Sequence, residues 1–278
     1  MKWGDFEIEV LSAGTMRLDG GAMFGVVPKV MWEKVAPPDE RNRIRLGLNC
    51  LLVRSSTGNL LIDTGCGNKL SEREIAIYQL QQEPGLEAEL ARCGLSADQI
   101  DVVVNTHLHF DHAGGNTRRV ESRVLPAFPR AKHVVQRREL ADAEAANERT
   151  RASYFPENWR PLVDSGQLTL LDGAAEVLPG VYCEPTPGHT AGHQSVRLES
   201  GGKTLYYMAD LCPTLAHVPL PWIMGYDLYP LTTLETRREV YRRAVAENWL
   251  ICFEHDPDHP WGRITVRDGK YTGEVEEL

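Results

Sequence analysis

The chain has 278 residues, 42% of them hydrophobic and 25% charged, with a formal net charge of −9. A chain of this length buries a large core without disulfide staples, and its acidic balance makes a general affinity for nucleic acid or anionic membranes unexpected. The six cysteines are scattered with no C-x-x-C pair, and neither an apolar signal core nor a run of transmembrane length is found. These features predict a cytoplasmic protein with reduced thiols.

The first hundred residues predict strands followed by helices. Phe6–Val10 alternates apolar and acidic residues, and turn-forming residues join two further apolar runs into a hairpin. Two segments with helical periodicity follow. The expected elements are strands at Phe6–Val10, Leu46–Arg54 and Asn59–Asp63, and helices at Glu72–Gln82 and Leu86–Cys93.

Between the first two strands, Met16–Trp32 is rich in large apolar side chains and is interrupted by Gly20, Gly21 and Pro28. Two readings stay open for this segment, which includes Phe24. It is either a loop packed on the core, or a pocket wall or dimer contact, because loops often carry such roles.

A buried strand at Asp101–Thr106 leads into the sequence His107-Leu108-His109-Phe110-Asp111-His112. If the chain stays extended, side chains two apart point the same way, so His107, His109 and Asp111 would converge. His112 would join them through a turn, which the glycines that follow make cheap. Imidazole is the commonest protein metal ligand, and carboxylate suits zinc, manganese or iron. The cluster therefore predicts a metal site.

The second half repeats the order of strands and helices. A strand at Lys132–Gln136 precedes a helix at Glu139–Asn147 and an aromatic loop at Ser153–Leu162, for which we favour packing over a lid. The remaining elements are strands at Leu168–Leu171, Val181–Pro185, Gln194–Leu198, Thr204–Met208 and Leu250–Phe253, a helix at Thr233–Asn248, and a closing hairpin over Arg263–Glu274.

Several of these strands end in a residue that can bind a metal. His189, Asp210 and His255 each follow a predicted strand, as His107 does. Strand ends that share one rim are where α/β architectures place active sites. Asp63 ends another strand before Gly65, where it either caps the turn or orients a ligand histidine from outside the metal.

Together these residues resemble the ordered motifs of the metallo-β-lactamase superfamily. The matching segments are His107-x-His109-x-Asp111-His112, Thr186-Pro187-Gly188-His189-Thr190-x-Gly192-His193, Asp210, His255 and the upstream Asp63-Thr64-Gly65. The resemblance implies an α/β (α+β) fold, a four-layer αβ/βα sandwich of two mixed sheets flanked by helices, formed by residues 1–278 as one domain.

The resemblance also implies a dinuclear centre. His107, His109 and His189 would bind one divalent ion, Asp111, His112 and His255 the other, and Asp210 would bridge them. We expect zinc, with manganese, iron or cobalt as alternatives. A hydroxide between the ions would attack a carbonyl or phosphoryl centre, and Asp111 would assist proton transfer.

Within the superfamily the pattern is most similar to N-acyl-homoserine lactonases and methyl-parathion-hydrolase-like enzymes. This predicts a small lactone or ester substrate and a cytoplasmic hydrolase, with a homodimer left open. Glyoxalase-II-like thioesterases and mononuclear-iron persulfide dioxygenases remain alternatives.

One departure from the lactonases concerns the substrate pocket. They carry a tyrosine shortly after the bridging aspartate, where this chain has Leu211-Cys212-Pro213-Thr214. Tyr226 is the candidate replacement, with Phe24, His217 and Trp222 as further candidate pocket residues. For His217 and Trp222, packing is the competing interpretation. His193 is expected to be structural.

Overall fold

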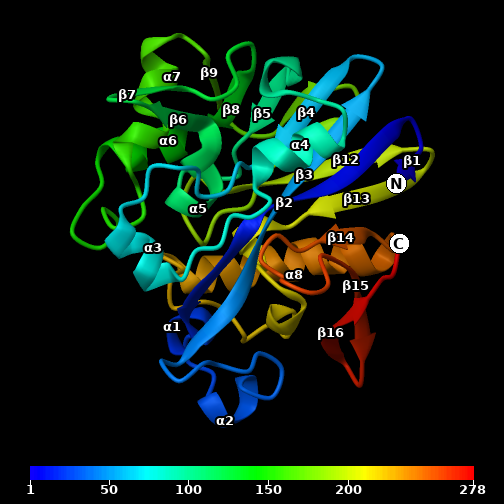
Figure 1. The fold of residues 1–278 in the computed structure, drawn as a ribbon. Helices are drawn as coiled ribbons and strands as arrows, with labels where there is room; N and C mark the ends of the chain where they lie inside the picture. The colour runs from blue at the N-terminus through cyan, green and yellow to red at the C-terminus, as the bar shows by residue number, and fades with distance from the viewer.

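The apolar strands of the first half assemble into one mixed sheet in the computed structural model, which describes residues 1–278 (Figure 1). Its first strands are antiparallel, and the later ones are parallel because helices and loops connect them. The order across the sheet is β1 (Lys2–Trp3), β2 (Phe6–Asp19), β3 (Arg43–Ser55), β4 (Gly58–Ile62), β5 (Val102–Val104), β8 (Lys132–Gln136) and β9 (Leu168–Leu171).

The second half forms another seven-stranded sheet, in which only β13 and β14 run parallel. Its order is β10 (Ala175–Leu178), β11 (Val181–Pro185), β12 (Gln194–Ser200), β13 (Lys203–Tyr207), β14 (Leu250–Cys252), β15 (Trp261–Arg267) and β16 (Lys270–Val275). A separate hairpin consists of β6 (Thr117–Val120) and β7 (Arg123–Pro126).

One large core lies between the two sheets. It joins Ile8, Leu51 and Val104 of the first sheet to Val196 and Leu205 of the second, all fully or almost fully buried. Burial of apolar area at about 25 cal/mol per Å² makes this interlayer contact the main favourable contribution to holding the halves together. Three further apolar clusters lie on the outer sides of the sheets, where helices and loops cover them.

The helices pack on the outer faces of the sheets. The longest, α8 (Pro230–Ala246), covers the second sheet through Val240 and Tyr241. The others are α1 (Gly20–Phe24), α2 (Lys29–Trp32), α3 (Glu72–Tyr78), α4 (Leu86–Arg92), α5 (Phe110–Ala113), α6 (Arg137–Glu144) and α7 (Arg160–Asp164), with 3₁₀ turns η1 (Ala97–Gln99), η2 (Gly114–Asn116), η3 (Pro156–Asn158), η4 (Ala209–Leu211) and η5 (Leu215–His217). The predicted four-layer sandwich is confirmed.

Several element bounds differ from the predictions; the helix predicted at Glu72–Gln82, for example, ends at Tyr78. Three further differences concern the opening strand, the segment after it and the approach to Asp111. The opening strand continues to Asp19, because the apolar alternation resumes after an irregularity between Ser12 and Thr15. The apolar segment after it forms α1 and α2 rather than a simple loop. The extended path predicted through Asp111 ends earlier, since the His109 carbonyl accepts the N–H groups of His112 and Ala113 and starts α5.

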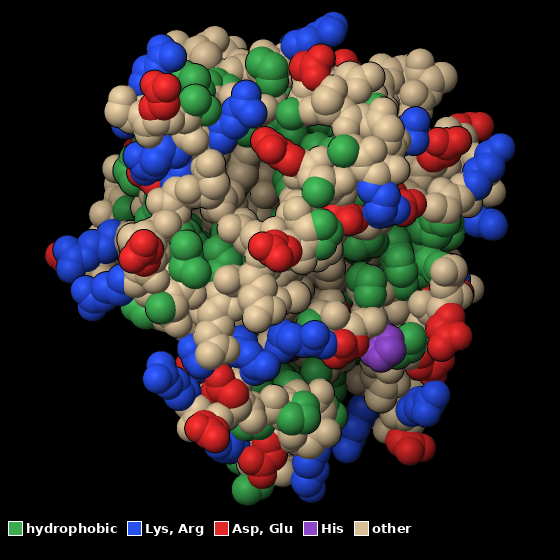
Figure 2. Space-filling model, viewed as in Figure 1, with side chains coloured by type: hydrophobic (Ala, Val, Ile, Leu, Met, Phe, Trp, Pro, Cys, Tyr) green, Lys and Arg blue, Asp and Glu red, His purple; other side chains and the backbone are tan.

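The surface carries charges of both signs. Figure 2 shows lysine and arginine side chains interspersed with acidic ones over the visible face. No helix has both the length and the apolar character that a membrane crossing would require.

Candidate metal centre

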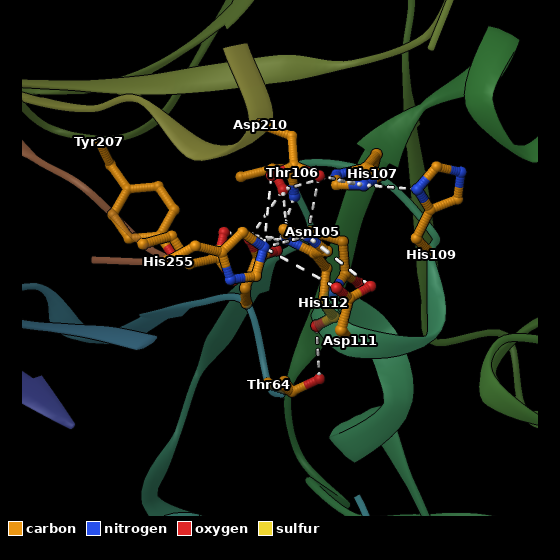
Figure 3. A network of polar contacts seen from close by, with 12 residues as sticks. Thr64, Asn105, Thr106, His107, His109, Asp111, His112, Tyr207, Asp210 and His255 are labelled. Carbon is orange, nitrogen blue, oxygen red and sulfur yellow. Dashed lines mark hydrogen bonds and ion pairs between the residues drawn. The ribbon is translucent and has the colours of Figure 1, made fainter. Parts of the chain in front are cut away.

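Four strand ends from the two sheets meet at one edge of the sandwich. His107 and His109 follow β5, and His189 lies in the loop after β11. Asp210 lies in η4 directly after β13, and His255 follows β14. The short helix α5 then turns Asp111 and His112 toward the same point (Figure 3).

A first group of ligand atoms consists of His107, His109, His189 and Asp210, whose atoms lie within 4.8 Å of one another. His109 Nδ1 is 3.0 Å from His107 Nε2 and 3.1 Å from His189 Nε2. His189 Nε2 is in turn 3.0 Å from Asp210 Oδ2. All four residues are buried.

A second group consists of Asp111, His112 and His255, also within 4.8 Å of one another. The Nε2 atoms of His112 and His255 are 3.3 Å apart. Asp210 lies between the two groups, with Oδ2 3.4 Å from His112 Nε2 and Oδ1 3.3 Å from His255 Nε2. The structure thus brings the seven predicted ligand side chains together, with Asp210 between the two groups.

The donor set fits metal ions. A neutral imidazole has one N–H and one lone pair, so the three nitrogens that meet at His109 cannot all be satisfied by donating to one another. Asp210 Oδ1 is likewise buried without a hydrogen-bond donor. Mixed nitrogen and oxygen donors suit zinc and the neighbouring divalent metals.

The electrostatic environment favours the neutral, ligand form of His107 and His109. Burial and the neighbouring imidazoles hold the pKa values of His107 and His109 well below their usual range, so both stay neutral. At His189 burial opposes a charge, but the carboxylates of Asp210 and Asp227 raise the pKa. Burial also opposes a charge on His255, but the adjacent Asp210 carboxylate raises its pKa to about 9. Metal binding there must therefore displace a proton.

Buried acceptors fix the outward-facing nitrogens of the ligand histidines. Asp63 Oδ2 is 3.1 Å from His112 Nδ1, as expected if this carboxylate orients a ligand, and it also accepts from the Thr106 hydroxyl at 2.7 Å. Asp227 Oδ1 accepts from His189 Nδ1 at 3.0 Å, and the Gly47 carbonyl accepts from His255 Nδ1 at 2.8 Å. Such partners set the tautomer and the orientation of metal-binding histidines.

Sequence reasoning missed two buried carboxylates that lie beside ligand histidines, Glu254 and Asp227. Glu254 Oε2 lies 2.9 Å from His112 Nδ1 and is fully buried, and its place next to His255 was a usable signal. Burial and the charge of Asp63 raise the pKa of Glu254 to about 8. Asp227 carries no local motif, and only the fold brings it to His189.

Five of the seven candidate ligands, His109, Asp111, His189, Asp210 and His255, line a cavity of about 170 Å³. Its wall is mainly apolar, and Arg149, Thr150 and Ser153 stand at one side. The lining residues are Leu18, Met23, Leu46, Tyr78, His109, Phe110, Asp111, Arg149, Thr150, Ala152, Ser153, His189, Asp210, Met224, Tyr226, Leu228 and His255.

The cavity corrects the predicted pocket. Tyr226 lines it, but Phe24, His217 and Trp222 do not. Phe24 stacks on His217 with ring centroids 4.3 Å apart and meets Trp222 edge-on at 5.7 Å. His217 is fully buried and hydrogen-bonded to Thr214 and to the Met23 carbonyl. Its ring therefore packs inside the protein and is not available to contact a substrate.

Three other residues occupy structural positions. His193 Nδ1 bonds to Thr186 at 2.9 Å, and the residue belongs to neither ligand group. In the aromatic loop, Tyr154 and Trp159 are buried against α6, as packing requires.

Comparisons with known proteins agree with this architecture. The sequence model of the family described as the metallo-beta-lactamase superfamily matches residues 44–257. An N-acyl homoserine lactonase of a Bacillus species is 30% identical over 228 residues, which cover 77% of this chain and 82% of that protein.

Solved structures with the same fold include a probable metal-dependent hydrolase from Staphylococcus aureus. It is 34% identical with a TM-score of 0.91, and the match covers 100% of this chain and 99% of that one. AidC, a dizinc quorum-quenching lactonase in complex with a product, is 21% identical with a TM-score of 0.84, covering 100% and 97%.

Proposed function

Since the chain belongs to the metallo-beta-lactamase superfamily and has lactonase relatives, we propose that this ester-hydrolysing metalloenzyme uses two divalent ions to open a small lactone or related ester. The observation that carries the proposal is the pair of ligand groups joined by Asp210 beside an apolar cavity. Zinc is the expected metal, because the donors are imidazole and carboxylate.

The bound ions would supply an activated water and polarise the carbonyl oxygen. The chain's own contribution begins with Asp111. Its carboxylate lies 3.8 Å from His255 Nε2 and 3.9 Å from His112 Nε2, farther than Asp210 lies from the same atoms. Asp111 also lines the cavity, so it is placed to hold a proton and pass it to the leaving oxygen.

Tyr226 donates a hydrogen bond to the substrate, in place of the tyrosine that the lactonases carry nearer the bridging aspartate. Leu211 and Cys212, which follow Asp210, are fully buried and do not line the cavity, whereas Tyr226 does. Burial raises the pKa of Tyr226 to about 12, which keeps its phenol protonated as a hydrogen-bond donor. The neighbouring Asp227 anchors this loop to the ligand His189.

The cavity wall selects for size and polarity. Leu18, Met23, Leu46, Met224 and Leu228 give it an apolar surface, which would exclude water and hold an aliphatic group. Its volume lies below the roughly 300–1,000 Å³ of pockets for drug-sized ligands. A short or compact acyl group is therefore the expected substituent.

An exposed apolar patch supports a homodimer as a further part of the proposal. Val26 is 88% exposed, Val30 66% and Val35 56%, and all three lie in or beside α1 and α2. Clustered apolar surface of this kind is typical of protein–protein contacts. Light scattering of the purified protein at micromolar concentration would distinguish a dimer from a monomer.

The six cysteines are free thiols, and five of them are buried. Since such thiols persist in a reducing compartment, we propose a cytoplasmic location. Fractionation of the source cells with detection of the native protein would test this placement.

The test of the proposed activity combines metal analysis with a substrate panel. The protein would be purified without added metal and assayed on short-chain and long-chain lactones, a thioester, a phosphotriester and a persulfide. About two zinc-like ions per chain with turnover of short lactones or esters is the expected result. Preference for the thioester would instead indicate a thioesterase, and one iron per chain with oxygen consumption on the persulfide would overturn the hydrolase mechanism.

A further inference from the structure

Glu139, in the first turn of α6, is a fully buried carboxylate outside both ligand groups. Its Oε1 accepts from the Leu108 backbone N–H at 3.0 Å and from the Tyr154 hydroxyl at 2.8 Å. Its Oε2 accepts from the Thr190 hydroxyl at 2.6 Å. All three donors are neutral groups, so Glu139 is held by hydrogen bonds rather than by an ion pair.

The donors belong to the segments that carry the first ligand group. Leu108 stands between the ligands His107 and His109, and Thr190 is the residue after His189. Tyr154 adds a third contact, because its ring packs on His109 with centroids 4.8 Å apart. One carboxylate thus touches both halves of the chain next to all three histidines of this group.

The backbone at Gly192 shows how closely the second ligand loop approaches α6. A Cβ on Gly192 would lie 2.3 Å from the Glu139 backbone nitrogen and 2.5 Å from its Cα. Real Cβ atoms essentially never come so near, so only glycine allows the loop to rest on this turn of the helix. The Thr190–Glu139 hydrogen bond then fixes the loop along that contact.

Burial makes the carboxylate expensive to keep there. Removing a charge from water without partners has a large desolvation cost, and each of the three donors offsets part of that cost. An apolar side chain would fill the same space without this cost. A role that needs acceptors at this place therefore explains Glu139 better than packing does.

We propose that Glu139 is a positioning residue that clamps the two loops bearing His107, His109 and His189, so that the first metal group is preorganised before the ion arrives. The inference rests on the proposed function, because it concerns the metal site on which that function depends. Partners of this kind behind metal ligands typically contribute about 10- to 100-fold in metal affinity.

The experiment compares Zn²⁺ binding by the wild type and four variants, starting from chelator-treated protein. Glu139→Ala removes the clamp, and Thr190→Val removes one of its bonds with little change in shape. Glu139→Gln keeps an oxygen for Leu108 and Tyr154 and an amide group facing the Thr190 hydroxyl. Glu144→Ala is the matched control, because Glu144 is exposed at the end of the same helix.

The affinities are measured by competition with a chelating dye, and Co²⁺ absorption spectra report the geometry of the site. Glu139→Ala is expected to lower the affinity for one of the two ions at least tenfold and to change the Co²⁺ spectrum. The affinity for the other ion should stay the same. Thr190→Val should give a smaller loss at the same ion. Glu139→Gln should stay within about threefold of the wild type, and Glu144→Ala should equal it.

The outcomes separate the two proposals. A wild-type protein that binds no metal would contradict the proposed function and this inference with it. Two tightly bound ions in the wild type, with unchanged affinity and spectrum in Glu139→Ala and Thr190→Val, would overturn the clamp alone. An equal loss in Glu139→Gln and Glu139→Ala would also overturn it, because charge rather than hydrogen-bond geometry would then be responsible. If Glu139→Ala does not fold by circular dichroism, Thr190→Val decides.

Discussion

At the residue scale, the candidate metal centre contains buried imidazole nitrogens and carboxylate oxygens that lie close to one another. The nitrogens of His107, His109 and His189 converge within about 3 Å, and Asp210 reaches both groups. Bringing these groups together costs desolvation energy that only a cation can repay in full. The side chains that face the cavity from this centre are therefore the ones whose substitution should affect turnover most.

Asp111→Asn tests the proton-transfer role. The amide keeps the size of the carboxylate and an oxygen, but it cannot accept a proton at neutral pH. We expect turnover to fall at least about 100-fold, the usual contribution of a positioned acid or base. The measurement is kcat together with metal content. Full turnover with two ions retained would contradict the role.

Tyr226→Phe tests the phenol as a donor to the substrate. Loss of one such donor to a developing oxyanion typically lowers kcat about 100-fold. Tyr78→Phe is the matched control, because Tyr78 also lines the cavity. Tyr78 ends α3, a helix with no buried residue, and its ring stacks on Phe110. We expect Tyr78→Phe to change kcat less than threefold. The reverse ranking would assign the role to Tyr78.

His133→Leu tests a pH-dependent contribution to stability. His133 is fully buried with both ring nitrogens unpartnered, and burial lowers its pKa to about 3. Between pH 6.5 and 3 the unfolded chain binds the proton that the folded chain excludes, so the free energy of unfolding falls as pH falls through this range. At pH 5 one such histidine costs about 2 kcal/mol.

The difference in free energy of unfolding between the variant and the wild type should therefore be about 2 kcal/mol more favourable to the variant at pH 5 than at pH 8. Urea unfolding with chelator present at both pH values measures this difference without a contribution from metal loss. His259→Gln, at an exposed histidine, is the control. An equal gain at both pH values would show that His133 is not the group responsible.

At the element scale, the helices differ in what holds them. Helix α8 buries Val240, Tyr241 and Ala244 against the second sheet. Helix α3 buries no residue, and Ile75 and Ile77 are exposed. Its start depends instead on a capping box, in which Ser71 accepts from the Glu74 N–H and Glu74 accepts from the Ser71 N–H. Because α3 carries Tyr78 to the cavity, this cap governs one wall of the site.

Ser71→Ala should loosen α3 without unfolding the molecule. Loss of an N-cap costs about 1 kcal/mol, which corresponds to roughly fivefold faster amide exchange if the helix opens locally. Hydrogen exchange read by mass spectrometry over residues 72–80 measures it, and Tm should stay the same. Ser71→Asp keeps an acceptor and should behave like the wild type. Unchanged exchange in Ser71→Ala would mean that contacts other than the cap hold the helix.

At the scale of the whole molecule, the centre joins the two sheets. His107, His109, Asp111 and His112 come from the first half, while His189, Asp210 and His255 come from the second. An ion bound by both halves stabilises the folded chain by RT ln(1 + [L]/Kd), about 4 kcal/mol at 1,000 times Kd. Metal binding and apolar packing should therefore both stabilise the contact between the two sheets.

Metal removal should lower the thermal stability of the entire chain. A loss of about 4 kcal/mol corresponds to roughly 8–16 °C in Tm for a chain of this size class. Differential scanning calorimetry before and after dialysis against a chelator measures the shift, and readdition of Zn²⁺ should restore it. An unchanged Tm in protein shown to have lost its metal would contradict a centre that bridges the halves.

Local sequence pattern was sufficient for most strands of the two large sheets and for α8, and it drew attention to the imidazoles and carboxylates at strand ends. The reason is that strand and helix periodicities are read over a few residues, and imidazoles after a strand are conspicuous there. The local pattern missed β10 and the β6–β7 hairpin. The resemblance of the ordered motifs also predicted the sandwich, and it named the seven side chains that the structure brings together. The extended path to Asp111 was wrong, because the Ala113 N–H closes a helical turn onto His109 that periodicity does not reveal.

Only the tertiary structure decided which distant residues support the site. Asp227 reaches His189 across 38 residues, and Glu139 reaches Thr190 across 51. Phe24, His217 and Trp222 looked like pocket residues, yet Phe24 stacks on His217 and meets Trp222 edge-on, and none of the three lines the cavity that Tyr226 lines. Burial and facing are properties of the packed layers, and a side chain's neighbours along the chain do not determine them.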